Sequence, residues 1–512
     1  MKKFLAIQLD GLSYRKLEEA SHKGFCPNMT NLMNNGYKAH KYNCGLPSNT
    51  PFAQAGIMYG KNDHIPGFTF VDKKIKKEFK VRNPLNTTLM EHLYLNGPKG
   101  ILENGRSYVN LFSGGAEYSR LTTSKLMDKK WMFKQFDILL MLGNPKVAAK
   151  VGYNTAKSAS TFFEYLYEKS ASIINNRSVT SDFKYNVTRL FSSVIFEELE
   201  TDAVIRDMKK GTPYIYITYN GYDENSHHQG PSSPAAFKAV KTIDNKIGKI
   251  VKHLGDYDLI ILSDHGHTES VPFQKLYGTK FEKFIHTSLK EYKHDRNPHY
   301  LKRKQADMHK IAKAAIHPFV MTEQGFHTLM SKTFKKQFRQ MSWNSHPYFL
   351  EVSDPLANLY FNFSPDKVQM TRIERKYPGF MDTLINHPGI GLVIGQDFGK
   401  VRVLNKYGEA IIGKRQSDHV FKGERFLKDY GDEKILIKQL EYFARMENSG
   451  DLILMGDYSK HNVISFINHY GSHGSAGGEQ MHPFFLTNKD VDLSNVTNVA
   501  ELYGIFRKYH EE

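Results

Sequence analysis

The chain has 512 residues, of which 40% are hydrophobic and 24% are charged. This balance supplies enough apolar side chains for a large buried core, so a globally disordered chain is excluded. The 70 Lys and Arg residues outnumber the 53 Asp and Glu residues and leave a formal net charge of +17. Such an excess favours polyanionic partners: phosphorylated substrates, nucleic acid or anionic lipid surfaces.

The cysteine content and the N-terminus bear on the compartment. With only Cys26 and Cys44, neither a disulfide framework nor a CxxC zinc knuckle can form. The apolar run 4–9 is too short for the apolar region of a signal peptide and ends at Asp10. No run reaches the roughly 18–20 uncharged residues that cross a bilayer. We therefore expect a cytoplasmic protein, with peripheral attachment to a membrane as the alternative.

Three short apolar runs are each followed by an acidic side chain. The runs cover residues 4–9, 213–219 and 257–263, and the acids are Asp10, Asp223 and Asp264. Near-continuous apolar runs of this length are typical of buried parallel strands. Ligands of open α/β sheets gather beyond the carboxyl ends of such strands, so the acids are expected to converge on one site. The sequence thus predicts an α/β fold with a central, mostly parallel sheet flanked by helices.

Histidines accompany two of these acids at spacings suited to metal binding. Asp223 stands four residues before His227, and on a helix both would lie on one face and could bind one ion. The adjacent His228 is the less favoured alternative. Asp264 is followed directly by His265, an acid and an imidazole that a loop at a strand end could direct at one point.

Two more histidines stand near glycines. His473 lies in the glycine-rich segment 471–478, where the backbone can pass close to a bound ion or phosphate. His267 follows the Asp-His-Gly segment. It is interpreted as an exposed loop histidine, and contact with substrate or metal is the alternative.

A hydroxyl residue stands at the start of a predicted helix. In the segment 46–57, Thr50 is followed by Pro51, a residue that favours the first helical turn. The amide hydrogens and dipole at that end of a helix favour an anion or an alkoxide. Thr50 is therefore a candidate nucleophile, and simple capping of the helix is the alternative role.

Together these motifs resemble the alkaline phosphatase superfamily, in particular its type I phosphodiesterase/nucleotide pyrophosphatase branch. A group of bacterial "alkaline phosphatase family" proteins sharing the Gln-Ala-Gly-Ile, Gly-Tyr-Asp and His-His-x-Gly-Pro segments is closer still. The resemblance implies an alkaline phosphatase-like core that holds two divalent metal ions. By motif, one ion would be bound by Asp10, Thr50, Asp264 and His265, and the other by Asp223, His227 and His473.

The resemblance also implies a reaction. The protein would be a metal-dependent phosphoesterase, by preference a phosphodiesterase for a nucleotide or lipid headgroup, in which Thr50 forms a covalent phospho-threonine. Mixed Asp and His ligation without cysteine favours Zn²⁺, with Mn²⁺ as the alternative. The alternative functions are a phosphoryl or headgroup transferase on the same scaffold and a non-catalytic polyanion-binding protein.

One part of the family pattern is missing. Nucleotide pyrophosphatases have an asparagine downstream of the nucleophile that binds the free phosphoryl oxygen of the substrate. The corresponding residues 63–70 contain no asparagine. Asn49 and Asn62 are both candidate replacements, and Asn49 is included in the predicted site.

The chain organisation is expected to be a core with two insertions. The catalytic core would comprise residues 1–105, 210–275 and 345–512. A helical insertion at 105–210 contains the bulky apolar segment 131–142, which favours a cap over the active site, with a membrane-facing segment as the alternative. A basic insertion at 275–345 would suit nucleic acid or phospholipid, although a solvated helix surface is the commoner explanation.

Overall fold

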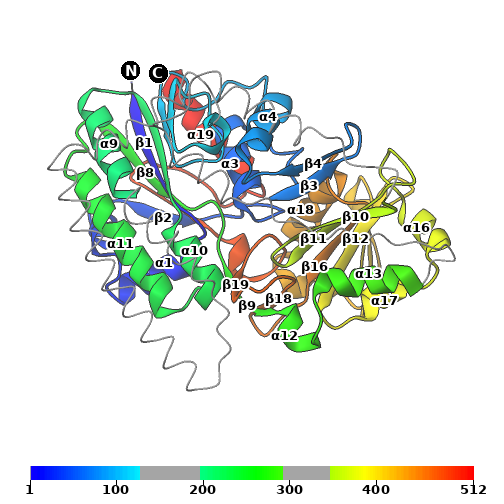
Figure 1. The fold of residues 1–512 in the computed structure, drawn as a ribbon. Helices are drawn as coiled ribbons and strands as arrows, with labels where there is room; N and C mark the ends of the chain where they lie inside the picture. The colour runs from blue at the N-terminus through cyan, green and yellow to red at the C-terminus, as the bar shows by residue number, and fades with distance from the viewer. Residues whose placement is uncertain (1, 127–196, 292–345, 512) are drawn as a thin grey trace, which may run out of the picture.

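The computed structural model describes residues 2–126, 197–291 and 346–511. Two seven-stranded sheets dominate the molecule, one in each half (Figure 1). The strands of the first sheet are, in order, β2 (Lys38–Lys41), β20 (Phe484–Thr487), β8 (Tyr257–Leu262), β1 (Lys3–Leu9), β7 (Tyr214–Tyr219), β5 (Arg106–Tyr108) and β6 (Tyr118–Arg120).

The three apolar runs form the centre of this first sheet. β1 pairs in parallel with β7 on one side and with β8 on the other. All six residues of β7 are buried, because both faces of the sheet are covered. β20 pairs antiparallel with β8 and with β2. The other neighbouring strands of this sheet pair in parallel, so the sheet is mostly parallel. The predicted α/β fold with a central sheet is confirmed.

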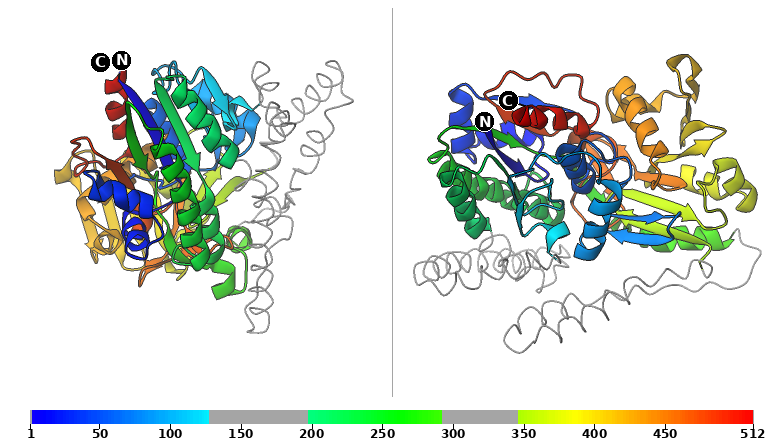
Figure 2. Two further views of the ribbon diagram at one scale, coloured as in Figure 1. Left: turned by 90° about the vertical axis from the view of Figure 1, so that its left-hand side faces the viewer. Right: turned by 90° about the horizontal axis from the view of Figure 1, so that it is seen from above.

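Helices cover both faces of the first sheet, and successive residues of β1 point to opposite faces. Leu5 and Ile7 pack in the cluster with helices α1 (Tyr14–His22), α2 (Pro27–Asn34), α9 (Glu197–Lys209) and α11 (Pro234–Val251). Phe4 and Ala6 belong to the opposite cluster with α3 (Thr50–Tyr59), α4 (Pro84–Tyr94), α18 (Glu433–Arg445) and α19 (Tyr503–Arg507). The two termini lie side by side (Figure 1, Figure 2), and the Phe4 ring lies 5.2 Å from the rings of Phe506 and Tyr509.

The second sheet is antiparallel throughout. Its strands are, in order, β10 (Tyr348–Ser353), β11 (Leu356–Phe361), β16 (Leu452–Gly456), β12 (Ile390–Asp397), β13 (Lys400–Asn405), β14 (Gly408–Ile412) and β15 (Val420–Gly423). One face packs on α13 (Phe281–Glu291), α16 (Met370–Lys376) and α17 (Phe380–Asn386), and the other packs on α18. These residues fall within the range expected for the catalytic core, and a separate sheet was not predicted there.

Two small sheets accompany the large ones. In the first, β9 (Thr268–Pro272) pairs in parallel with β18 (Asn462–Ser465) and antiparallel with β19 (Gly471–Ser472), while β17 (Tyr458–Ser459) pairs with β18. It lies between the two halves (Figure 1). The second is the hairpin of β3 (Thr69–Asp72) and β4 (Lys77–Lys80). The pairing of β9 with β19 brings residues just after β8 next to residues close to the C-terminus.

The predicted insertions fall partly outside the described residues. Residues 127–196, which include the segment 131–142, and residues 292–345 are not described. The described ends of the range 105–210 contain β5, β6 and the helix α9. β5 and β6 extend the first sheet beyond β7. The division into core and insertions stays a prediction. Within the described ranges, no helix is both long and apolar enough to cross a membrane.

Asp244 links helix α11 to helix α2 through hydrogen bonds, and its substitution tests how much this contact contributes to stability. Its buried carboxylate accepts the backbone N–H groups of Asn28 and Met29, each at 2.9 Å. Asp244→Ala would leave both donors unpaired, so we expect the free energy of unfolding to fall by about 2–3 kcal/mol in denaturant titrations. The exposed neighbour offers a control, and Asn245→Ala should change it by less than about 0.5 kcal/mol. Equal losses in both variants would contradict this account.

Candidate active site

The carboxyl ends of the three central strands meet at one place. Asp10 directly follows β1, Asp264 is the second residue after β8, and Asp223 lies in α10 (Gly221–Gln229), the helix that begins after β7. All three carboxyl groups are buried. Parallel neighbours end at the same edge of a sheet, which is why acids far apart in sequence come together.

Asp10, Thr50, Asp264 and His265 form the first cluster. The Nε2 atom of His265 lies 3.1 Å from Thr50 Oγ1, 3.4 Å from Asp10 Oδ1 and 3.5 Å from Asp264 Oδ2. Thr50 Oγ1 lies 3.4 Å from Asp10 Oδ1. Thr50 is the first residue of α3, and the side chain of Asn49 caps that helix by accepting the N–H of Phe52.

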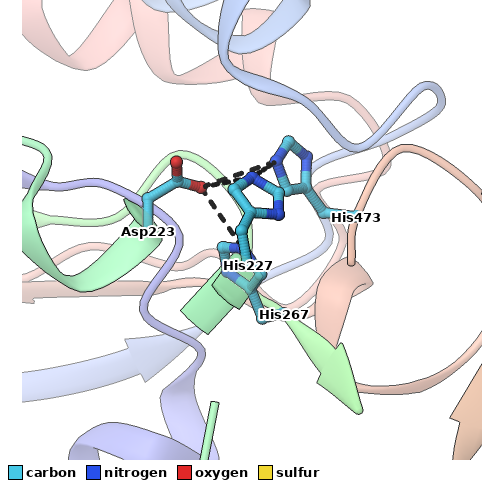
Figure 3. A group of neighbouring side chains, drawn as sticks. All are labelled: Asp223, His227, His267 and His473. Atoms are coloured by element: carbon cyan, nitrogen blue, oxygen red, sulfur yellow. Dashed lines mark hydrogen bonds and ion pairs between the residues drawn. The ribbon is translucent and has the colours of Figure 1, made fainter. Parts of the chain in front are cut away.

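Asp223, His227 and His473 form the second cluster, together with His267 (Figure 3). The Oδ1 atom of Asp223 lies 3.5 Å from His227 Nε2 and 3.5 Å from His473 Nε2. The two Nε2 atoms are 3.2 Å apart. As expected from the spacing of four, Asp223 and His227 share one face of a helix, α10.

Backbone carbonyl groups orient every imidazole in the two clusters. Each Nδ1 atom lies at hydrogen-bond distance from a carbonyl oxygen: His227 from Gly471 (2.9 Å), His265 from Gly266 (3.0 Å), His267 from Gly11 (3.0 Å) and His473 from Ser48 (3.1 Å). A carbonyl oxygen only accepts, so Nδ1 carries the hydrogen. In the neutral ring, Nε2 then presents a lone pair to the cluster, which is the usual arrangement of a metal-binding histidine.

The donor atoms fit divalent metal ions. Bonds of about 2.0–2.1 Å in tetrahedral geometry place neighbouring ligand atoms about 3.3–3.4 Å apart. The separations given above for the two clusters run from 3.1 to 3.5 Å. Carboxylate oxygens and imidazole lone pairs repel one another at such distances unless a cation lies between them. In addition, Asp223 Oδ1 and Asp264 Oδ2 are buried without a hydrogen-bond partner.

Comparison with models of protein families identifies the family of this chain. The model of the type I phosphodiesterase/nucleotide pyrophosphatase family matches residues 4–324, more than half of the chain. The chain belongs to this family. The family is part of the alkaline phosphatase superfamily and is metal-dependent, so the protein is a hydrolase that acts on phosphoric ester bonds.

The solved structures that match this chain include two proteins. Mouse ectonucleotide pyrophosphatase/phosphodiesterase 5 is 13% identical, with a TM-score of 0.45, and the match covers 99% of this chain and 94% of that one. Phosphonoacetate hydrolase from Sinorhizobium meliloti 1021, in complex with phosphonoformate, is 14% identical, with a TM-score of 0.49 and coverages of 99% and 95%. The comparison with curated proteins gave no match.

In this member of the phosphodiesterase family, the first cluster carries an excess of negative charge. Burial, with Asp264 and Asp223 close by, raises the pKa of Asp10 well above its usual range. Burial alone would lower the pKa of His265, but the nearby carboxylates of Asp264 and Asp10 outweigh it and raise that pKa to about 10. Both shifts indicate a place that favours positive charge, as a divalent cation would supply.

The histidines of the second cluster show the opposite shift. Burial lowers the pKa of His227 and of His473 well below the usual value, and neighbouring imidazoles lower the pKa of His473 further. Burial also lowers the pKa of His267, against the pull of Asp223. The rings therefore stay neutral at lower pH than an exposed histidine, and the neutral ring is the form that binds metal.

The interpretation of His267 as an exposed loop residue is wrong, because the residue is only 1% exposed. The segment after β8 leads directly into β9, which turns the ring inward over Gly11. A Cβ atom on Gly11 would lie 2.4 Å from that ring, and Gly11 has φ +74°. His267 stands two residues after His265, and alternate residues of an extended segment point to the same side. This spacing was the sequence signal that His267 faces the cluster.

Asp354 and His469 lie behind His227 and were not predicted. The Oδ1 atom of Asp354 is 2.5 Å from His469 Nδ1 and 3.6 Å from His227 Nδ1. Burial would raise the pKa of Asp354, but the two imidazoles outweigh it and lower that pKa. The 3.6 Å between Asp354 and His227 is an ion-pair distance and not a hydrogen bond, because His227 Nδ1 donates to the Gly471 carbonyl oxygen. Asp354 belongs to the β10–β11 turn of the second sheet, so nothing in the local sequence links it to His227.

The structure distinguishes the two asparagines considered for phosphoryl binding. Both ends of the Asn62 amide are engaged: Nδ2 donates to Asn498 Oδ1 at 2.9 Å, and Oδ1 accepts the Tyr442 hydroxyl at 2.6 Å. Asn49 uses Oδ1 to cap α3, whereas its Nδ2 is buried without a hydrogen-bond partner. The unsatisfied donor next to Thr50 therefore belongs to Asn49.

Proposed function

We propose that the protein hydrolyses a phosphodiester through a covalent ester formed on Thr50, at a site that holds two divalent ions. Zn²⁺ suits the Asp and His donors best, and Mn²⁺ is the second choice. The observation that carries the proposal is the position of Thr50 Oγ1, 3.1 Å from His265 Nε2 and 3.4 Å from Asp10 Oδ1 at the start of α3. One ion would be held by Asp10, Thr50, Asp264 and His265, and the other by Asp223, His227 and His473.

Thr50 would act as the nucleophile. The bound cations would neutralise charge on the phosphoryl group and lower the pKa of the hydroxyl. The positive end of the α3 dipole further favours the alkoxide. Thr50 Oγ1 would attack phosphorus, and the bond to the leaving alkoxide would break. Water would then attack the same phosphorus, and Thr50 would leave as alkoxide and regain its proton.

Asn49 would orient the substrate. Its Nδ2 has no protein acceptor, and a non-bridging phosphoryl oxygen of a substrate attacked by the adjacent Thr50 would supply one. Such a donor strengthens its hydrogen bond as charge develops on that oxygen in the transition state.

Asn49→Asp tests this role with little change in shape. Asp caps a helix as well as Asn does, so the melting temperature should stay close to the wild-type value. The variant presents a carboxylate to the phosphoryl oxygen in place of a donor, and kcat/KM should fall by about 10²–10³-fold. Wild-type kcat/KM in a folded Asn49→Asp variant would exclude Asn49 from substrate binding.

A hydrolysis panel tests the proposed function as a whole. The substrates are bis-p-nitrophenyl phosphate, p-nitrophenyl phosphate, a nucleotide ester and a phospholipid, each with and without chelator. We expect metal-dependent hydrolysis, faster for the diester than for the monoester. A monoesterase preference would overturn the substrate class, and absence of any metal-dependent hydrolysis would overturn the reaction. Turnover of the phospholipid would support contact of the protein with a membrane surface.

A further inference from the structure

We propose that His267 is a fourth protein ligand in the second cluster, so that this ion binds one carboxylate and three imidazoles. The inference rests on the proposed two-ion site and adds to it a residue that the ligand assignment leaves out. Asp223, His227, His267 and His473 supply ligand atoms that all lie within 4.8 Å of one another (Figure 3).

The position of His267 matches that of the two histidines already assigned. Its Nδ1 lies 3.0 Å from the Gly11 carbonyl oxygen, which leaves Nε2 as the inward-facing atom. That Nε2 lies 3.3 Å from Asp223 Oδ1, and neither atom has a hydrogen-bond partner. His227 and His473 approach the same oxygen atom at 3.5 Å each. A cation that binds Asp223 Oδ1 together with these two rings is therefore within reach of His267 as well.

The alternative is a protonated His267 that donates from Nε2 to Asp223. This arrangement would keep a positive charge in the protein interior, with the ring centroids of His227 and His473 only 4.8 Å and 4.9 Å away. The residue is only 1% exposed, so little solvent is available to stabilise such a charge. A neutral His267 that binds the same cation as Asp223 gives both His267 Nε2 and Asp223 Oδ1 a partner, and no positively charged imidazole has to be buried.

The backbone makes room for the ring. Gly11 follows Asp10 of the first cluster, and a Cβ there would lie 2.4 Å from His267 Cε1 and 3.1 Å from Asp223 Oδ1. Only glycine at this position allows His267 and Asp223 to approach each other. Four protein ligands fill a tetrahedral zinc shell, which can expand to five ligands when a phosphoryl oxygen binds, so His267 should contribute strongly to the affinity of this cluster for metal.

The test compares Zn²⁺ binding by the full-length wild type, His267→Ala and His267→Gln, using competition with a chromophoric chelator. We expect two ions in the wild type. In both variants, one ion should keep its wild-type affinity, which also shows that the fold persists. The other should bind more than 100-fold more weakly, beyond the about 10–100-fold that loss of an outer hydrogen-bond partner costs. His387→Ala, which removes a half-buried imidazole that stacks on Phe273 and belongs to neither cluster, is the matched control and should bind both ions as the wild type does.

His267→Gln separates the two roles of the ring, because its amide can still donate a hydrogen bond to Asp223 but replaces imidazole poorly as a zinc ligand. A loss of less than 100-fold in either folded variant would overturn the ligand role, and if His267→Ala does not fold, His267→Gln alone decides. The Co²⁺-substituted proteins give a second readout, because loss of a ligand should change the visible absorption of the ion and loss of an outer partner should not. A wild-type protein without stoichiometric Zn²⁺ would overturn the proposed function itself, whereas two ions held equally by wild type and variants would overturn only the role of His267.

Discussion

Thr50→Ala is expected to lower kcat by on the order of 10⁴-fold or more, because the nucleophile of a covalent mechanism has no substitute. Metal content should stay near the wild-type value. Asp10, Asp264 and His265 remain to hold the first ion, and the hydrogen bonds of Thr50 Oγ1 are to Asp10 and His265 of that cluster. The assay is hydrolysis of bis-p-nitrophenyl phosphate together with elemental analysis of the same sample.

Thr50→Ser is the matched control. It keeps a hydroxyl at the start of α3, where Asn49 caps the helix, so it should retain far more activity than Thr50→Ala. Two results would contradict the assignment of the nucleophile. One is undiminished hydrolysis by Thr50→Ala, and the other is equal inactivity of both variants at full metal content.

Removal of the metal ions is expected to abolish hydrolysis and to destabilise the fold. Without cations, the buried carboxyl groups of Asp10, Asp223 and Asp264 face one another, and burial with this repulsion raises the pKa of Asp10 well above its usual range. An ion that binds only the folded protein adds about 4 kcal/mol to the free energy of unfolding when its free concentration is 1,000-fold above Kd. Thermal unfolding with chelator and with added Zn²⁺ measures the effect, and activity is followed in parallel.

A pair of aspartate variants serves as control for metal removal. Asp264→Asn should lose most of the stabilisation by Zn²⁺ that the first cluster supplies, because Asp264 is a buried ligand. Asp256→Asn removes a carboxylate that pairs with Lys3 at the protein surface, and it should respond to Zn²⁺ as the wild type does. Identical unfolding curves for the wild type with and without metal would show that neither cluster binds an ion.

The parts of the fold and site that could be predicted are those with a local signal. The strands that became β1, β7 and β8 were apparent because burial on both faces requires continuous apolar runs. Asp10, Asp223 and Asp264 were apparent because each follows such a run, and the parallel arrangement places their carboxyl groups together. The segment around Thr50 combined a hydroxyl residue with a proline, which marks a helix start independently of tertiary contacts.

The parts that were missed depend on contacts between distant segments. The second sheet consists of antiparallel strands such as β14, in which buried residues alternate with less buried ones, and short strands of this kind give a weak sequence signal. Asp354 reaches His227 only because the β10–β11 turn approaches α10. The spacing of two from His265 indicated the side of the segment on which His267 lies, but the burial of its ring depends on the close passage of Gly11, which is distant in sequence.

The central claim is that side chains from five separate segments enclose two cations beside one hydroxyl. Anomalous diffraction at the zinc absorption edge, from a crystal of the wild-type protein grown with Zn²⁺, tests it most directly. The account predicts two anomalous peaks: one bonded to Asp10, Asp264, His265 and Thr50, and one bonded to Asp223, His227, His473 and His267. Full-occupancy zinc bound only elsewhere, or no anomalous peak at either cluster, would contradict it.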